Sequence, residues 1–324
     1  MLWNLSSSFT ASLRVPLKGS ASSLAEVAVL LMAYGTPRSD DEIAPYLTDI
    51  RRGQPPSREA LEELKQRYRK IGGRSPLLEI TNTQASALQQ KLKEDGVQTR
   101  VYVGMRHWHP YINETVPQIL GNGHERLVAL PLAPHYSQIS IGGYKQALEK
   151  ALSNSKIRPD FVESWYDNPV FHEAVAEKAR SALEKFPAPK EVDVIFTAHS
   201  LPERILKTGD PYSSQIQASI QAVANILGLS HWSLAYQSAG MTNEKWLGPD
   251  ILEELKLRGT GSSVLIVPIG FVSDHLEILY DIDVKAQEFA KSRGLRLVRS
   301  ESLNASPTFI RALAEIVKAR ANAR

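Results

Sequence analysis

Short apolar runs alternate along the chain with stretches of helical periodicity. The runs predict strands over Val27–Ala33, Arg100–Met105, Arg126–Leu132, Phe161–Ser164, Val192–Ala198, Ser233–Gln237 and Val264–Ile269. Several of these runs are continuous and β-branched, which is typical of strands covered on both faces. Apolar stripes predict helices over Glu59–Ile71, Thr83–Lys93, Gly143–Leu152, Val170–Phe186, Ser213–Leu227, Trp246–Leu257 and Pro307–Ala319. The alternation of strands and helices indicates βαβ units, so we predict an α/β fold with parallel sheets.

The predicted elements divide into two halves of similar content, which indicates two α/β lobes. We place the first lobe at residues 26–155 and the second at 156–304, with the crossing point in the turn-rich segment Ser153–Pro159. A last helix within residues 305–324 is expected to pack back on the first lobe. Residues 1–25 hold seven serines, two basic residues and no acidic residue, so we interpret them as a disordered tail or a targeting-like segment outside the fold.

Composition narrows the class of protein. The 324 residues include no cysteine, which excludes a disulfide framework, a cysteine nucleophile, and zinc or iron–sulfur sites built on cysteine. The net charge of +3 is too small to predict nucleic-acid binding. No apolar run approaches the roughly 20 residues that a membrane-spanning helix needs, so we expect no transmembrane segment and a cytoplasmic protein.

Candidate chemistry follows the predicted strands, at the sheet edge where α/β folds bind ligands. His199 comes directly after the strand Val192–Ala198, where an imidazole is well placed for proton transfer near neutral pH; the alternative is a histidine hydrogen-bonded to a loop carbonyl. Glu277 and Asp281 are four residues apart in a predicted helix and share one face. Such carboxylates repel each other unless they share a cation or a proton, as in a weak metal path; the alternative is a capping box of Asp274 and Glu277.

Imidazole and guanidinium groups in the first half have two interpretations each. His107 either lines a pocket or packs against Trp108, and its two-residue spacing to His109 supplies no third ligand for a structural zinc site. Arg51 and Arg67 are either surface arginines or, at the mouth of a pocket, bidentate partners of ligand carboxylates. Spacing alone therefore predicts a two-lobed α/β protein with a site built from histidine and acidic residues.

A set of motifs extends this interpretation. They are LLMAYGTP (30–37), IRRG (50–53), RYRKIGGRSPL (67–77), LAPHYS (132–137), ESWYDNP (163–169), TAHSLPERI (197–205), GDPY (209–212), YQSAG (236–240), WLGPD (246–250) and PIGFVSDHLEILYD (268–281). Together and in this order, these strings resemble the ferrochelatase family over residues 27–320. Within that family, the chain is most similar to the bacterial coproporphyrin III ferrochelatases.

The resemblance implies two Rossmann-like lobes with a porphyrin cleft between them, in which ferrous iron is inserted into the porphyrin without redox chemistry. His199 matches the family histidine that receives pyrrole protons and meets the metal, and Glu277 matches the acid on the same side of the ring. Asp281 extends this acidic path, and His107 is a further candidate metal donor. Tyr34 matches a tyrosine on the opposite face, an axial ligand of product iron. The positions that match contacts to the propionates or the porphyrin edge are Arg51, Arg67, Tyr68, Ser75 and Tyr144.

The resemblance also implies the cofactors and partners. Ferrous iron is a substrate, no organic cofactor is expected, and the chain lacks the cysteine-bearing extension that holds an iron–sulfur cluster in some relatives. We predict coproporphyrin III as the porphyrin, with protoporphyrin IX as the alternative. Two further alternatives are a porphyrin or haem carrier without turnover and a chelatase for another tetrapyrrole or metal. We expect a monomer whose partner downstream is a haem-handling enzyme.

Overall fold

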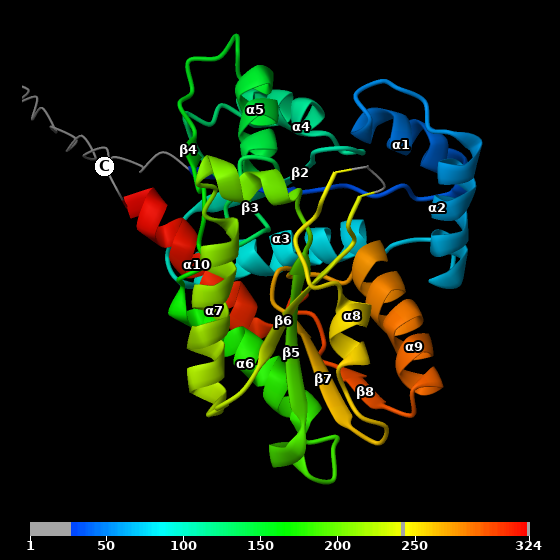
Figure 1. Ribbon diagram of the computed structural model, residues 1–324. Coiled ribbons are helices and arrows are strands. Elements are labelled where there is room, and N and C mark those ends of the chain that lie inside the picture. Colours follow the sequence, from blue (N-terminus) through cyan, green and yellow to red (C-terminus); the bar gives the residue numbers. More distant parts are fainter. Residues whose placement is uncertain (1–26, 241–243, 323–324) are drawn as a thin grey trace, which may run out of the picture.

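The computed structural model describes residues 27–240 and 244–322, so the tail predicted at residues 1–25 lies outside the described residues. Two parallel four-stranded sheets, each flanked by helices, form two lobes (Figure 1). The first sheet has the order β2-β1-β3-β4 and comprises β1 (Val27–Ala33), β2 (Thr99–Met105), β3 (Arg126–Pro131) and β4 (Asp160–Phe161). The second has the order β6-β5-β7-β8 and comprises β5 (Asp193–His199), β6 (Ser233–Gln237), β7 (Ser263–Pro268) and β8 (Arg296–Arg299). This architecture confirms the predicted two-lobed α/β fold.

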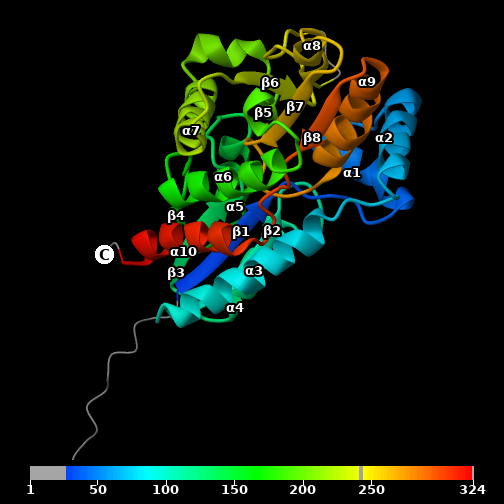
Figure 2. The ribbon, with the colours of Figure 1, turned by 90° about the horizontal axis from the view of Figure 1, so that it is seen from below.

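Helices connect the strands of each lobe. Those of the first lobe are α1 (Ile43–Ile50), α2 (Arg58–Lys70), α3 (Leu77–Glu94), α4 (Ile112–Gly121) and α5 (Ile141–Ala151). Those of the second lobe are α6 (Pro169–Leu183), α7 (Tyr212–Leu227), α8 (Ile251–Lys256), a π-helical segment η4 (Ile278–Ala286) and α9 (Gln287–Ser292). The last helix, α10 (Pro307–Asn322), lies beside α3 of the first lobe and also packs against α6 (Figure 2).

Three apolar clusters hold the layers together. One covers the outer face of the first sheet under α4 and α5, and another covers the outer face of the second sheet under α8, η4 and α9. The third and largest cluster joins the inner faces of both sheets through α3, α6, α7 and α10. It contains Leu31 of β1 and Phe196 of β5, both fully buried, so the two lobes share one continuous core.

The boundary between the lobes lies later in the chain than the sequence suggests. β4 pairs in parallel with β3, through Val128 with Asp160 and Ala129 with Phe161. The first sheet therefore extends beyond the boundary expected at residue 155, and Ser153–Pro159 leads into its edge strand instead of crossing between lobes. The strand predicted over Phe161–Ser164 overlaps β4, but it was assigned to the second lobe.

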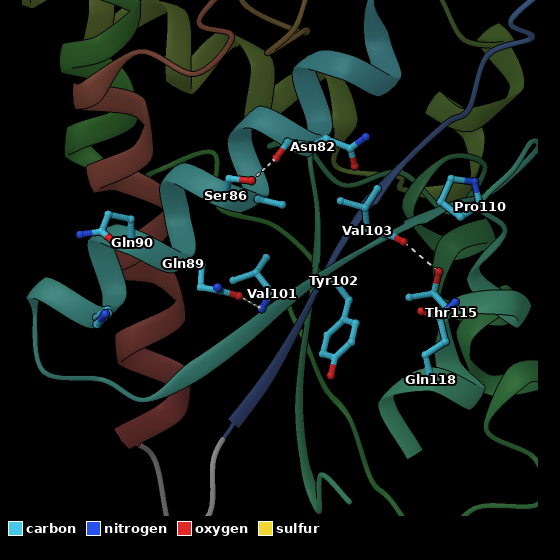
Figure 3. A pocket seen from close by; sticks show the side chains of 12 residues that line it. Asn82, Ser86, Gln89, Gln90, Val101, Tyr102, Val103, Pro110, Thr115 and Gln118 are labelled. Carbon is cyan, nitrogen blue, oxygen red and sulfur yellow. Dashed lines mark hydrogen bonds between the residues drawn. The ribbon is translucent and has the colours of Figure 1, made fainter. Parts of the chain in front are cut away.

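The free edge of β2 is covered by polar side chains. A surface hollow of about 590 Å³ lies there between α3, β2 and α4 (Figure 3). In it, Gln89 Oε1 accepts a hydrogen bond from Val101 N at 3.0 Å, and Thr115 Oγ1 donates one to Val103 O at 2.8 Å. These bonds satisfy backbone groups that an edge strand otherwise leaves open to other chains. We therefore interpret the hollow as edge protection.

Candidate functional site

The site begins where β5 and β7 end, at adjacent positions of the second sheet. His199 is the last residue of β5, and the segment after β7 leads to Glu277. Gly270 allows these two chain segments to meet, because a Cβ atom at this position would lie 2.7 Å from Ala198 Cβ and 2.8 Å from Ala198 Cα. Only a residue without a side chain fits such a close approach.

His199 and Glu277 form a contacting pair. His199 Nε2 lies 3.5 Å from Glu277 Oε1, and the other carboxylate oxygen, Oε2, lies 3.6 Å from Nε2 of His275. His199 Nδ1 hydrogen-bonds to the carbonyl of Ser200, which as an acceptor fixes the proton on Nδ1 and leaves Nε2 toward Glu277. The side chains of His199 and Glu277 are 32% and 33% exposed, so both remain accessible to a substrate.

The electrostatics of the pair favour its charged form. Burial lowers the pKa of His199, but the charge of Glu277, the hydrogen bonds to Glu277 and Ser200, and the charge of Asp281 together outweigh burial and raise that pKa above its ordinary value. Burial likewise raises the pKa of Glu277, but the charges of His199 and His275 outweigh it and hold this pKa well below its usual range. The proton of the pair therefore lies on His199, and a cation bound at Glu277 would oppose it.

The loop before Glu277 is held by a separate set of bonds. Asp274 accepts hydrogen bonds from Ser302 Oγ at 2.8 Å and from Asn304 Nδ2 at 2.9 Å, and its Oδ1 lies 3.1 Å from Arg299 Nη1. Asp274 thus anchors the loop to the segment after β8. The capping-box alternative for Asp274 and Glu277 is wrong, because Asp274 N donates its hydrogen bond to Asn304 Oδ1 at 2.9 Å and the Glu277 carboxylate contacts His199 and His275 instead.

Asp281 lies one turn beyond Glu277 in η4, a π-helical segment of the kind often found at functional sites. It is buried and hydrogen-bonds to Ser238 Oγ. Burial, and after it the charge of Glu277, raises the pKa of Asp281. Arg67 of α2 lowers that pKa and has its guanidinium 5.3 Å from the ring centroid of Tyr280, so the first lobe reaches η4 here.

The first lobe presents an aromatic group to the same site. The ring of Tyr34, directly after β1, lies 4.6 Å from that of His107, which follows β2. His107 Nδ1 in turn hydrogen-bonds to Asp49 Oδ2 at 2.8 Å. Close packing, together with the charge of Glu277, raises the pKa of Tyr34 to about 12, although 41% of this residue is exposed. The charge of Glu277 thus acts across the boundary between the lobes on the phenol of Tyr34.

Other predicted residues surround this arrangement. Tyr144 of α5 is buried, with the guanidinium of Arg106 5.7 Å from its ring centroid. Tyr68 of α2 is buried, and its hydroxyl lies 3.0 Å from Thr36 Oγ1. Burial is the main cause of the raised pKa of Tyr68, and Glu277 adds to it, so this phenol also lies near the second lobe.

The remaining two predicted positions differ in accessibility. Arg51 ends α1 and is exposed, and no ion-pair partner for it lies within residues 27–240 and 244–322. Ser75 is buried, and its Oγ accepts a hydrogen bond from Leu77 N at 3.3 Å, at the start of α3. Arg51 is thus available to a ligand, whereas the hydroxyl of Ser75 already serves the helix.

The motif LAPHYS binds the lobes to each other. His135 is buried with Nε2 3.0 Å from Ser219 Oγ of α7, and burial lowers its pKa to about 3. Asp210 accepts hydrogen bonds from Ser137 Oγ and Gln138 N, both at 2.9 Å. These groups fix the relative position of the lobes and hence the distance across the site.

Two residues of the site were not among the predicted ones. His275 belongs to the string DHLE, so its proximity to Glu277 could have been inferred from that motif. Asp49 has no local signal, because its partner His107 is 58 residues away in the chain. Across the described ranges, no group of three or more His, Asp or Glu side chains is arranged to hold a metal ion. No described helix is long and apolar enough to cross a membrane.

Comparison with known proteins identifies relatives along nearly the whole chain. The family model described as Ferrochelatase matches residues 26–321. A protein from Herpetosiphon aurantiacus named Ferrochelatase is 44% identical over 300 residues, which cover 90% of this chain and 98% of the relative. One from Halalkalibacterium halodurans named Coproporphyrin III ferrochelatase is 40% identical over 299 residues, covering 90% and 96%. The solved structure of SirB from Bacillus subtilis with Fe3+ has a TM-score of 0.58 at 12% identity, covering 92% and 96%, which is a likeness of fold.

Proposed function

The chain belongs to the ferrochelatase family and is an enzyme that inserts a metal ion into a porphyrin; on this premise we propose that its substrates are ferrous iron and coproporphyrin III. The observation that carries the proposal is the pair of His199 Nε2 and Glu277 Oε1 at 3.5 Å, and the charge of Glu277 also raises the pKa of Tyr34 in the first lobe. The porphyrin ring is proposed to lie between them, in a cleft between the two lobes.

Metal insertion exchanges two pyrrole protons for one divalent cation. In this proposal, the neutral form of His199 accepts the two pyrrole protons in turn at Nε2 and releases each to solvent, and Glu277 balances the positive charge. Iron enters on the same side, where imidazole and carboxylate are donors that ferrous iron accepts. Asp281 lies next along η4, where the charge of Arg67 of α2 acts on it, so Asp281 is proposed to bind the cation before it reaches Glu277. His107, which is hydrogen-bonded to Asp49, is left out of this donor set.

A two-donor site suits delivery better than storage. A closed set of four ligands holds a metal tightly, whereas one imidazole and one carboxylate can release it to the four nitrogens of the porphyrin. The released iron is proposed to meet Tyr34 on the opposite face, since tyrosine is a known axial ligand of haem iron. Tyr144 and Tyr68 would line the ring edge, and Ser75 would lie behind it.

The basic groups at the edge of the site support a porphyrin with many carboxylates. Coproporphyrin III carries a propionate on every pyrrole ring, whereas protoporphyrin IX carries vinyl groups on two of them. Arg51 and Arg52 are exposed, and within the described residues neither has an ion-pair partner, so both are free to bind carboxylates. Binding energy collected there can offset the roughly 1–5 kcal/mol that bending the ring typically costs.

The decisive experiment compares the two porphyrins side by side. Purified enzyme receives ferrous iron under anaerobic conditions with either coproporphyrin III or protoporphyrin IX, and formation of the iron complex is followed by absorbance. We expect a kcat/KM at least tenfold higher for coproporphyrin III. A higher value for protoporphyrin IX would overturn the substrate assignment and leave the family activity standing.

Two variants test the roles of the residues. His199→Ala should abolish iron insertion while coproporphyrin III still binds, as measured by fluorescence quenching. Arg51→Ala should raise the KM for the porphyrin about tenfold and also lower kcat, because the binding energy lost there offsets the bending of the ring. Arg320→Ala, which changes an exposed arginine on the distant α10, is the matched control and should leave both constants unchanged.

A further inference from the structure

Tyr34 has an unusually free side chain for a residue at the centre of the site. It is 41% exposed, and no hydrogen bond to its hydroxyl is found among the described residues. Its backbone is firmly placed, because its carbonyl accepts a hydrogen bond from His107 N at 2.8 Å and Gly35 turns the chain with φ of +104°. The orientation of the phenol must therefore come from contacts of its ring.

His107 supplies such a ring contact. The two ring centroids lie 4.6 Å apart with an interplanar angle of 54°, within the range of favourable aromatic packing. An imidazole can hold the phenol in one rotamer only if the imidazole itself is fixed. The rotamer of Tyr34 therefore depends on the group that orients His107.

Asp49 fixes His107. Its carboxylate oxygen Oδ2 lies 2.8 Å from His107 Nδ1, and a carboxylate can only accept, so the imidazole carries its proton on Nδ1. The bond ties the last turn of α1 to the segment after β2. Asp49 also lies two residues before Arg51. The C-terminal end of α1 therefore carries both the carboxylate that fixes His107 and the arginine proposed to bind the porphyrin carboxylates.

We propose that Asp49 is a positioning residue that holds His107 against Tyr34 and thereby aims the phenol at the iron of the product. This inference rests on the proposed function, since it assumes that the iron–porphyrin product binds beside Tyr34. Asp49 touches neither iron nor porphyrin. Asp49 acts on the iron–porphyrin product through its hydrogen bond to His107 and the ring contact of His107 with Tyr34. This effect requires an oxygen that accepts from Nδ1–H more than it requires a negative charge.

The test uses the ferric complex of coproporphyrin III as the probe, added to the full chain without turnover. Ligation by a phenolate changes the visible spectrum of ferric haem, so the difference between wild type and Tyr34→Phe defines the tyrosine signal. Asp49→Ala should lose most of that signal and weaken binding of the complex about tenfold. Asp49→Asn keeps an oxygen that accepts from Nδ1–H and should retain the signal, with binding within about threefold of wild type.

Three results would overturn the inference. One is an Asp49→Ala spectrum equal to wild type, and another is equal loss in Asp49→Ala and Asp49→Asn, which would assign the effect to charge. The third is a wild-type spectrum equal to that of Tyr34→Phe. Asp41→Ala, which removes an exposed carboxylate from the turn before α1, is the control and should change nothing. A chain that shows the tyrosine signal but inserts no iron would refute the proposed function alone.

Discussion

Gly270→Ala tests whether the meeting of β5 and β7 positions the reacting histidine. The new Cβ would lie 2.7 Å from Ala198 Cβ, which is 0.7 Å short of the 3.4 Å at which ordinary van der Waals contact begins. Ala198 belongs to β5, an inner strand of the second sheet, so the backbone there cannot yield without disturbing both neighbouring strands. Overpacking of this kind typically costs ~1–3 kcal/mol of the free energy of unfolding.

The same displacement would reach the catalytic step, because His199 follows Ala198 directly. Misplacing a reacting group by about 1 Å can lower the rate by about 100-fold, so we expect kcat to fall 10- to 100-fold while coproporphyrin III still binds. Urea denaturation measures the loss of stability, and the absorbance assay with ferrous iron measures kcat.

The matched control for this change is Gly259→Ala. The nearest atom to a Cβ at Gly259 is Ser262 Oγ at 3.9 Å, which is an ordinary contact, so stability and kcat should both stay near wild type. A kcat within twofold of wild type in Gly270→Ala, despite the loss of stability, would refute the argument that this contact sets the position of His199.

Further predictions concern the charge at the site and the bonds between the lobes. Burial lowers the pKa of His199, but interactions that include the charge of Glu277 raise it above 6.5. Glu277→Gln should therefore lower the maximal kcat/KM and shift the acidic limb of the pH profile of kcat/KM to lower pH. An acidic limb at the wild-type pH would contradict this. Asp210→Ala should cost ~1–3 kcal/mol in urea denaturation, because it leaves two donors of the first lobe without their acceptor. Burial lowers the pKa of His135 to about 3, so the folded state keeps this imidazole neutral while the unfolded chain protonates it below about 6.5. The free energy of unfolding should therefore fall by up to ~1.4 kcal/mol per pH unit between about 6.5 and 3, and His135→Gln should flatten this slope in acid denaturation.

Much of the sheet structure could be predicted because buried parallel strands are continuous apolar runs. β1 and β6 were predicted over their observed residues, and the bounds of β2, β3, β5 and β7 differ from the predicted ones by one residue. β8 was not predicted, because its sequence Arg-Leu-Val-Arg places charges at both ends of an edge strand. A short edge strand with charged ends has no apolar run to detect.

Helix prediction was limited by proline and by tertiary packing. α4 contains Pro117, which argues against a helix in any local analysis. The helix predicted from Trp246 begins only at Ile251, because Gly248 and Pro249 prevent an earlier start and Asp250 caps the observed helix α8. The helix α4 thus depends on packing that a sequence window does not contain, whereas the late start of α8 follows from the local residues Gly248, Pro249 and Asp250.

The candidate site was predictable where one motif holds the chemistry and not where two distant segments combine. His199 was identified by its place after a strand, and Glu277 by its spacing to Asp281. That these residues of β5 and η4 would touch follows from the order of the second sheet, which local patterns do not give. The bond between Asp49 and His107 is of the same kind, since neither position signals the other.

The apolar cluster shared by the two sheets restricts how the protein can respond to a bound molecule. Swinging one lobe away from the other about a hinge would expose side chains of both β1 and β5 to water, so closure by rigid rotation is disfavoured. The proposed porphyrin site between the lobes would then keep a fixed width. A ring that does not match this width would have to change shape itself, so the stiffness of the shared core would favour the distortion of the porphyrin.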